Sequence, residues 1–171
     1  MAWTHQAGAA RSSDMPVPAN LRSWEHHESR SAILGMQLGY EQAFDAGKAP
    51  ASLRDCIDAV DPAALVPFFR EIMGRVLTPA EIEQTERFWR SDLGVHYADV
   101  LLARFRGRAG VVSPYQPAPL NADEQAQVDK LNGSPAWTKL GEETSRRRDD
   151  GELVMKTPMM ALVRACTAKG G

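Results

Sequence analysis

The sequence predicts an all-α fold, arranged as a single compact domain of seven or eight helices. Alanine, leucine, glutamate, glutamine and arginine dominate the 171 residues, whereas runs of β-branched residues are almost absent. Helix start signals recur along the chain, and apolar residues follow them at helical spacing. Apolar residues make up 43% of a chain long enough to bury one core.

The chain divides into two predicted regions. Residues 1–19 are polar, small and proline-containing, so we expect a disordered segment there. Residues 20–171 form the predicted helical domain. Asn20 is a candidate cap for a long first helix that ends near Ala46, and Gly47 would stop it.

Two further start signals follow. Ser52 is a candidate cap for a short helix that places Cys56 on its apolar face. Asp61 followed by Pro62 is a cap with proline at the first helical position, so a new helix is expected to begin at once. This helix carries the strongest amphipathic stripe in the chain, which consists of Leu65, Phe68, Phe69, Ile72, Met73 and Val76.

Two stretches, 77–106 and 120–148, have related sequences when they are offset by 43 positions. The first has a capping box formed by Thr78 and Glu81, a short helix to about Arg90, and a second helix capped by Ser91. The corresponding residues of the second stretch are Asn121, Glu124 and Ser134. Periods near 40 residues are typical of helix-pair repeats. Two units are too few for a solenoid, so the other helices must complete the core.

The second helix of each unit has a predicted inner face. These faces consist of Leu93, Tyr97, Val100, Leu101 and Phe105 in the first unit, and of Ala136, Trp137 and Leu140 in the second. Glycines and prolines predict a loop over about 107–119 between the units. A turn at 149–151 precedes the last helix, and Pro158 is expected to kink that helix or delay its start.

Cys56 and Cys166 are the only cysteines, and both lie on apolar stripes. Two isolated cysteines make no zinc motif. Either they are buried free thiols, or they form a disulfide that ties an early helix to the C-terminus. A disulfide would favour an oxidising compartment such as the periplasm. The start of the chain lacks the apolar centre of a secretory signal, so we expect a mature periplasmic form or, as the alternative, a cytoplasmic protein.

The stretch "LTPAEIEQTERFWRSDLG" (77–94) resembles a proteobacterial, mostly periplasmic helical domain family of unknown function. Its members carry a Leu-Thr-Pro-Glu-Glu start followed by Phe-Tyr-x-Ser-Pro-x-Gly. The residues that match in type are Leu77, Thr78, Pro79, Phe88, Trp89, Ser91, Leu93 and Gly94. The chain departs from the pattern at Asp92, where proline is usual, and at Trp137, where a second unit would carry glycine. The resemblance implies a helical fold and a periplasmic location, and no activity.

The best metal candidate is "WEHHES", in which His26 and His27 are adjacent. Neighbouring helical residues point about 100° apart, so an exposed pair is expected rather than a metal site. His96 has no obvious orienting carboxylate nearby in sequence and is expected to be structural. The sequence contains no nucleophile elbow, phosphate loop or dinucleotide fingerprint. We therefore expect neither catalytic residues nor a cofactor.

These observations favour a non-enzymatic periplasmic protein that binds another protein. A specific form is an immunity protein that inhibits a cell-wall-degrading amidase of type VI secretion. With a net charge of −2 and no long apolar run, we expect no nucleic-acid partner and no membrane span. The predicted partner-binding residues are Arg108, Val111, Val112, Ser113, Tyr115 and Gln116. The alternatives are a metal-dependent enzyme using His26 and His27, and a homodimeric scaffold with a ligand between the repeats.

Overall fold

The computed structural model of the chain describes residues 21–111 and 116–169. Within these two ranges the chain forms eight α-helices, one short 3-10 helix and no strand, which confirms the predicted all-α class. The elements are α1 (Trp24–Asp45), η3 (Ala51–Leu53), α2 (Arg54–Asp58), α3 (Val66–Val76), α4 (Pro79–Arg90), α5 (Asp92–Arg108), α6 (Ala122–Asn132), α7 (Pro135–Thr144) and α8 (Lys156–Lys169). The segment 1–19 and Asn20 lie outside the described ranges.

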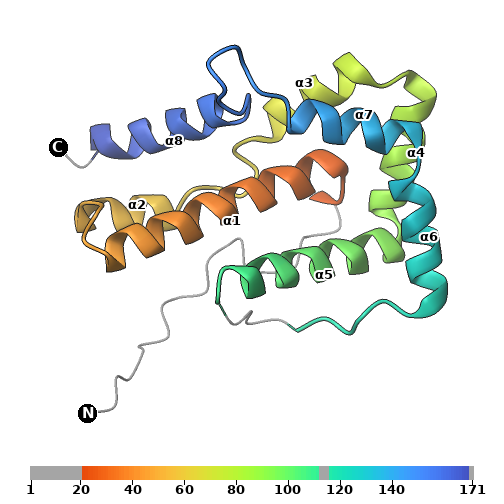
Figure 1. Ribbon diagram of the computed structural model, residues 1–171, viewed down its shortest axis with the longest axis horizontal. Coiled ribbons are helices and arrows are strands. Elements are labelled where there is room, and N and C mark those ends of the chain that lie inside the picture. Colours follow the sequence, from red (N-terminus) through yellow and green to blue (C-terminus); the bar gives the residue numbers. More distant parts are fainter. Residues whose placement is uncertain (1–20, 112–115, 170–171) are drawn as a thin grey trace.

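Helix α1 lies at the centre of the molecule, as Figure 1 shows. It packs against α2, α3, α4 and α8, while α3 also contacts α7 and α4 contacts α5. The most completely buried large side chains of the protein come from four of these helices and α6; they are Trp24, Ile33, Leu34, Ile57, Phe69, Ile72, Val128 and Leu140. Because helices surround α1, its apolar residues occur on several sides rather than on one stripe.

Two buried polar side chains of α1 anchor the segments that follow it. Ser29 donates to the Pro62 carbonyl at 2.7 Å and accepts from the Leu65 N–H at 2.9 Å. Gln37 donates to the carbonyl oxygens of Ile57 and Asp58 at 3.1 and 3.2 Å, at the end of α2. Both side chains are fully buried. They therefore satisfy backbone groups that would otherwise lose their hydrogen bonds on burial.

Two of the predicted helix starts lie earlier in the chain than the observed α-helices. Asp61 does cap a turn, since its carboxylate accepts from the Ala63 N–H at 2.8 Å, but α3 begins only at Val66. Ser29 holds the intervening turn in place. Ser52 lies inside η3 and caps nothing; the α-helix begins at Arg54, with no side-chain cap.

The start of α1 is capped by Ser23. The Ser23 hydroxyl accepts from the His26 N–H at 3.2 Å, so the described helix starts at Trp24. Its end near Ala46 is confirmed, and Gly47 adopts a φ of +67°, a left-handed conformation in which glycine avoids the steric cost of a Cβ.

Both predicted capping boxes are present. The Thr78 hydroxyl accepts from the Glu81 N–H at 3.3 Å, and the Glu81 carboxylate accepts from the Thr78 N–H at 2.8 Å. Asn121 and Glu124 make the same two bonds at 3.0 and 2.9 Å. The serine caps of α5 and α7 are confirmed as well, because the Ser91 and Ser134 hydroxyls each accept from the N–H three residues further on.

The two helix pairs contact each other reciprocally through these capping boxes. Lys139 of α7 donates to the Glu81 carboxylate at 2.7 Å. His96 of α5 lies with its Nδ1 3.1 Å from the Glu124 carboxylate. Positions 96 and 139 are again 43 apart. Each capping-box glutamate thus receives a nitrogen donor from the second helix of the other pair, a relation that no local pattern indicates.

The inner face of α5 differs from the prediction at its end. Phe105 is 40% exposed, whereas Arg106 is 4% exposed. The buried stripe runs through Ala98, Leu102 and Arg106, each one helical turn from the next. In the last helix, Pro158 falls in the first turn of α8, where a missing N–H costs nothing, so the predicted delay of the start is the observed outcome.

Candidate functional site

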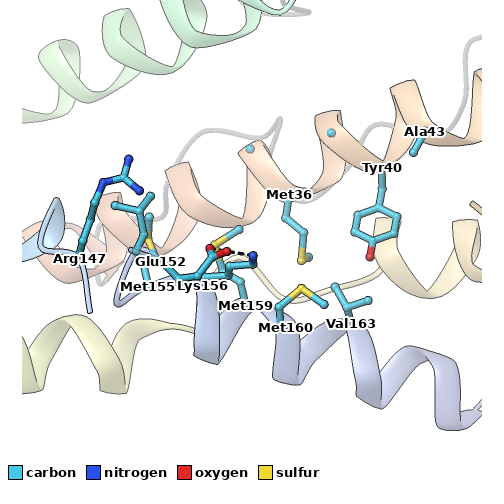
Figure 2. Close-up of a pocket in the computed structure, with 13 residues that line it drawn as sticks. Met36, Tyr40, Ala43, Arg147, Glu152, Met155, Lys156, Met159, Met160 and Val163 are labelled. Carbon is cyan, nitrogen blue, oxygen red and sulfur yellow. Dashed lines mark ion pairs between the residues drawn. The ribbon is translucent and has the colours of Figure 1, made fainter. Parts of the chain in front are cut away.

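A groove of about 490 Å³ lies between α1 and α8. Its walls come from α1, from the turn before α8 and from α8 itself (Figure 2). The residues that line it are Gly35, Met36, Gly39, Tyr40, Ala43, Arg147, Glu152, Leu153, Met155, Lys156, Met159, Met160 and Val163. Volume and lining are those of a small-molecule or ion site, because such sites are mostly apolar with a few polar groups. The groove joins the first and last helices, whereas the sequence placed a possible ligand groove between the two repeats.

Methionine side chains dominate the groove. Met36 comes from α1 and is 5% exposed, whereas Met160 of α8 is 37% exposed. Met155 and Met159 are one helical turn apart and pack partly against the main core. In Figure 2 the side chains of Met36 and Met160 point toward one another across the groove. Four of the seven methionines of the chain therefore share one cavity.

The charged groups of the groove are engaged with one another or with the backbone. Lys156 and Glu152 form an ion pair at 2.7 Å, one helical turn apart. Arg147 donates to the Gly151 carbonyl at 2.6 Å. Gly151 adopts a φ of +80°, so a side chain there would be strained. These bonds hold the turn that forms one end of the groove.

A disulfide fixes the wall formed by α8. Cys56 of α2 and Cys166 of α8 are bonded, with their Cα atoms 5.6 Å apart. Of the two alternatives left open by the sequence, the structure has the disulfide rather than free thiols. Because α2 also packs against α1, the bond sets the position of α8 relative to both helices.

The predicted partner-binding residues lie at the end of α5 and in the segment after it. Arg108, Val111 and Gln116 are exposed. Val112, Ser113 and Tyr115 lie outside the described residues. Phe105 and Val111 are two of the three exposed large apolar side chains of the described ranges, the third being Met160. Phe105 was missed as a surface residue because its spacing fits the inner face of α5.

The two adjacent histidines considered as metal ligands have different surroundings. His26 is half-buried, with its Nδ1 2.8 Å from the Ser23 hydroxyl, and burial lowers its pKa. His27 is 8% exposed, and its ring stacks on Trp89 with centroids 4.5 Å apart. Within 21–111 and 116–169, no group of three or more His, Cys, Asp and Glu side chains is placed to hold a metal ion.

Burial dominates the electrostatics of His27. Desolvation, assisted by the positive charge of Arg30, lowers the pKa of His27 to about 3. The folded protein therefore holds His27 neutral over most of the acid range. The unfolded chain, with a pKa near 6.5, takes up the proton first.

This difference predicts acid-sensitive stability. A histidine whose pKa is lowered in the folded state contributes stability above pH 6.5, and this stability is lost as the pH falls toward 3. Relative to a His27→Phe variant, which keeps a ring against Trp89, the native protein should lose about 1.4 kcal/mol of unfolding free energy per pH unit below 6.5. Urea denaturation of both proteins at pH 7 and pH 4.5 measures the difference. Equal losses in the two proteins would contradict the prediction.

His96 has a carboxylate partner that the sequence does not reveal. Its Nδ1 faces Glu124 at 3.1 Å, and its Nε2 faces the Ala118 carbonyl at 2.7 Å. Carboxylate and carbonyl oxygens only accept, so this arrangement favours the protonated ring, in which both nitrogens donate. The carbonyl of Ala118, followed by Glu124, raises the pKa of His96. Between these two acceptors, the His96 ring links α5 to the segment before α6 and to α6 itself.

Two carboxyl groups near the start of α1 also meet. Glu25 is 6% exposed, and its carboxylate lies near that of Glu86 of α4. Burial, together with the negative charge of Glu25, raises the pKa of Glu86. Arg90 pairs with Glu86 at 2.8 Å, and Arg70 lies 3.6 Å from Glu25. This pair links α1 to α4 and lies outside the residues that line the groove.

In the ranges that the structure describes, no helix has the length and apolar character needed to cross a membrane. No protein-family model, curated protein or solved structure matches the chain.

Proposed function

We propose that this chain is a non-enzymatic protein of an oxidising compartment, such as the periplasm, that binds another protein. The observation that carries the proposal is the surface at the end of α5. Phe105, Arg108 and Val111 lie within seven residues of one another and are all exposed. Apolar side chains beside an arginine are typical of the residues that contribute most to protein interfaces.

The disulfide supports the proposal that the protein works in an oxidising compartment. Disulfides form and persist mainly in secreted and periplasmic proteins, because cytosolic thiol systems reduce them. Cys166 is 3% exposed, and the bond spans 110 residues, so it acts as a structural link rather than as an exposed redox group. The proposed family resemblance points to the same compartment.

As a specific partner we propose a cell-wall-degrading amidase of type VI secretion, which the chain would inhibit as an immunity protein. The end of α5 and the segment after it are rich in apolar and proline residues and could enter an enzyme cleft.

The test measures hydrolysis of cell-wall fragments by purified amidases of this class, with and without an equimolar amount of the protein. The native protein should abolish the activity of its partner amidase. The double variant Arg108→Glu/Val111→Asp should weaken binding at least about thirtyfold, because residues at the centre of an interface contribute about 2 kcal/mol or more.

A matched control carries the same kind of change on α8, where Ala161 and Arg164 are exposed. Ala161→Asp/Arg164→Glu should inhibit like the native protein, and both variants should keep the native thermal midpoint. If no amidase is inhibited, the immunity proposal is wrong. If the two double variants lose binding equally, the α5 surface is not the contact site.

A further inference from the structure

Four methionine side chains line the groove between α1 and α8. Met36 reaches it from α1, and Met155, Met159 and Met160 reach it from the opposite wall (Figure 2). Methionine often fills gaps in cores, where its flexible side chain occupies the available volume. Here the four side chains line about 490 Å³ of open volume instead of filling it. The groove therefore leaves room for a ligand beside these side chains.

Thioethers select a narrow class of ligand. Soft sulfur ligands favour Cu(I), whereas carboxylate and carbonyl oxygens favour Mg²⁺ and Ca²⁺. Glu152 is the carboxylate among the lining residues, and Lys156 neutralises it at 2.7 Å. The groove thus offers a hard divalent cation no unpaired carboxylate. Several neutral sulfurs can hold a soft monovalent cation without an unpaired carboxylate.

Other candidate donors for a soft ion, His27 included, lie away from the groove. Both cysteines form the disulfide, so no thiolate is available. The Nδ1 of His26 lies against Ser23, and both ring nitrogens of His96 have acceptors. None of these residues lines the groove. In the described part of the chain, the groove is the place where several soft donors converge.

We propose that Met36, Met155, Met159 and Met160 form a binding site for Cu(I) in the groove between α1 and α8. Met36 on one wall and the three α8-side methionines on the other would close on the ion from two directions. Ion binding would thereby add a link between α1 and α8 near the Cys56–Cys166 bond. Arg108 and Val111 of the proposed partner surface do not line the groove, although the Phe105 ring packs against Gly35, which does.

Thioether coordination has a property that distinguishes it from histidine or cysteine coordination. Histidine and cysteine must lose a proton to bind a metal, so their affinities fall as the pH falls. Methionine sulfur carries no proton between pH 5 and pH 8. The affinity of the groove for Cu(I) should therefore be the same at pH 8 and pH 5.

The experiment titrates the oxidised full-length protein anaerobically with Cu(I), kept reduced by ascorbate, against a chromophoric Cu(I) chelator. We expect one Cu(I) per chain, and no binding of Zn²⁺ under the same conditions. The variant Met36→Leu/Met159→Leu should bind at least about tenfold more weakly, since even outer-shell changes at metal sites cost 10–100-fold. Leucine is close to methionine in volume, so the fold should tolerate the change.

Met73→Leu is the matched control, because Met73 is 6% exposed in α3 and does not line the groove. It should bind Cu(I) like the native protein. The proposal is overturned if the native protein does not compete with the chelator, if its affinity falls steeply between pH 8 and pH 5, or if the groove variant binds like the control. The Arg108→Glu/Val111→Asp variant should retain Cu(I) binding, so failure of this proposal is distinguishable from failure of the proposed partner surface.

Discussion

Replacing both cysteines with alanine should lower the free energy of unfolding by about 4–5 kcal/mol. The disulfide joins Cys56 to Cys166 across 110 residues, and a cross-link restricts the unfolded chain more as the loop it closes becomes longer. The whole chain from α3 to α7 lies inside this loop. For a domain of this size the thermal midpoint should fall by roughly 10–15 °C.

The measurement is thermal unfolding by circular dichroism, with and without a reducing agent. Reduction should lower the thermal midpoint of the native protein by a similar amount and leave that of Cys56→Ala/Cys166→Ala unchanged. The double variant separates loss of the cross-link from any side effect of the reductant. If the oxidised and reduced native proteins unfold at the same temperature, the bond does not stabilise the fold.

Replacing Gly94 with alanine should cost about 3 kcal/mol, at the upper end of overpacking effects. A Cβ on Gly94 would lie 2.1 Å from the Phe88 carbonyl oxygen and 2.8 Å from the Trp89 Cα. Both are backbone atoms of the preceding helix, which cannot move aside as a flexible side chain can. The corner between α4 and α5 would have to open, and the Ser91 cap, whose hydroxyl accepts from the Gly94 N–H, would be strained.

Gly141→Ala is the matched control, because Gly141 lies within α7 and a Cβ there meets nothing within 4 Å. Alanine is the better helix former, so this variant should be more stable by about 0.5–1 kcal/mol. Urea denaturation of both variants should therefore give changes of opposite sign. If Gly94→Ala lowers the free energy of unfolding by less than about 0.5 kcal/mol, the usual effect of a surface substitution, the corner is not tight.

The corresponding corner between α6 and α7 is built differently. Trp137 occupies the position equivalent to Gly94, and its N–H makes the same bond to a serine cap. Its ring stacks on Trp89 with centroids 5.7 Å apart. The second corner therefore accommodates a Cβ and uses the side chain to join the two helix pairs, whereas the first is closed against the backbone.

Local features of the fold could be predicted from the sequence. The caps at Thr78, Ser91, Asn121 and Ser134 are all present as expected. Each depends on residues three positions apart, so the whole signal lies within one turn of helix. The helix start predicted at Asp61 is too early, because the bonds that Ser29 makes from α1 decide where α3 begins. The start predicted at Ser52 is early because a 3-10 turn precedes α2.

Little of the candidate site could be predicted in the same way. Met36 is separated from Met159 by most of the chain, and nothing in their local sequence indicates that they share a groove. The carboxylate beside His96 comes from the other helix pair. His27 was expected at the surface, but its ring is covered by Trp89, and only the packing of α1 against α4 brings the two together.

The sequence by itself determined the helical class, most of the helix boundaries and the matching caps of the two helix pairs. These depend on backbone propensity and on hydrogen bonds between near neighbours, which the order of residues specifies directly. Tertiary structure alone decided the disulfide between Cys56 and Cys166, the methionine groove and the exposure of Phe105. Each of these follows from which helices lie side by side, because burial and long-range contacts bring together residues that are remote in the chain.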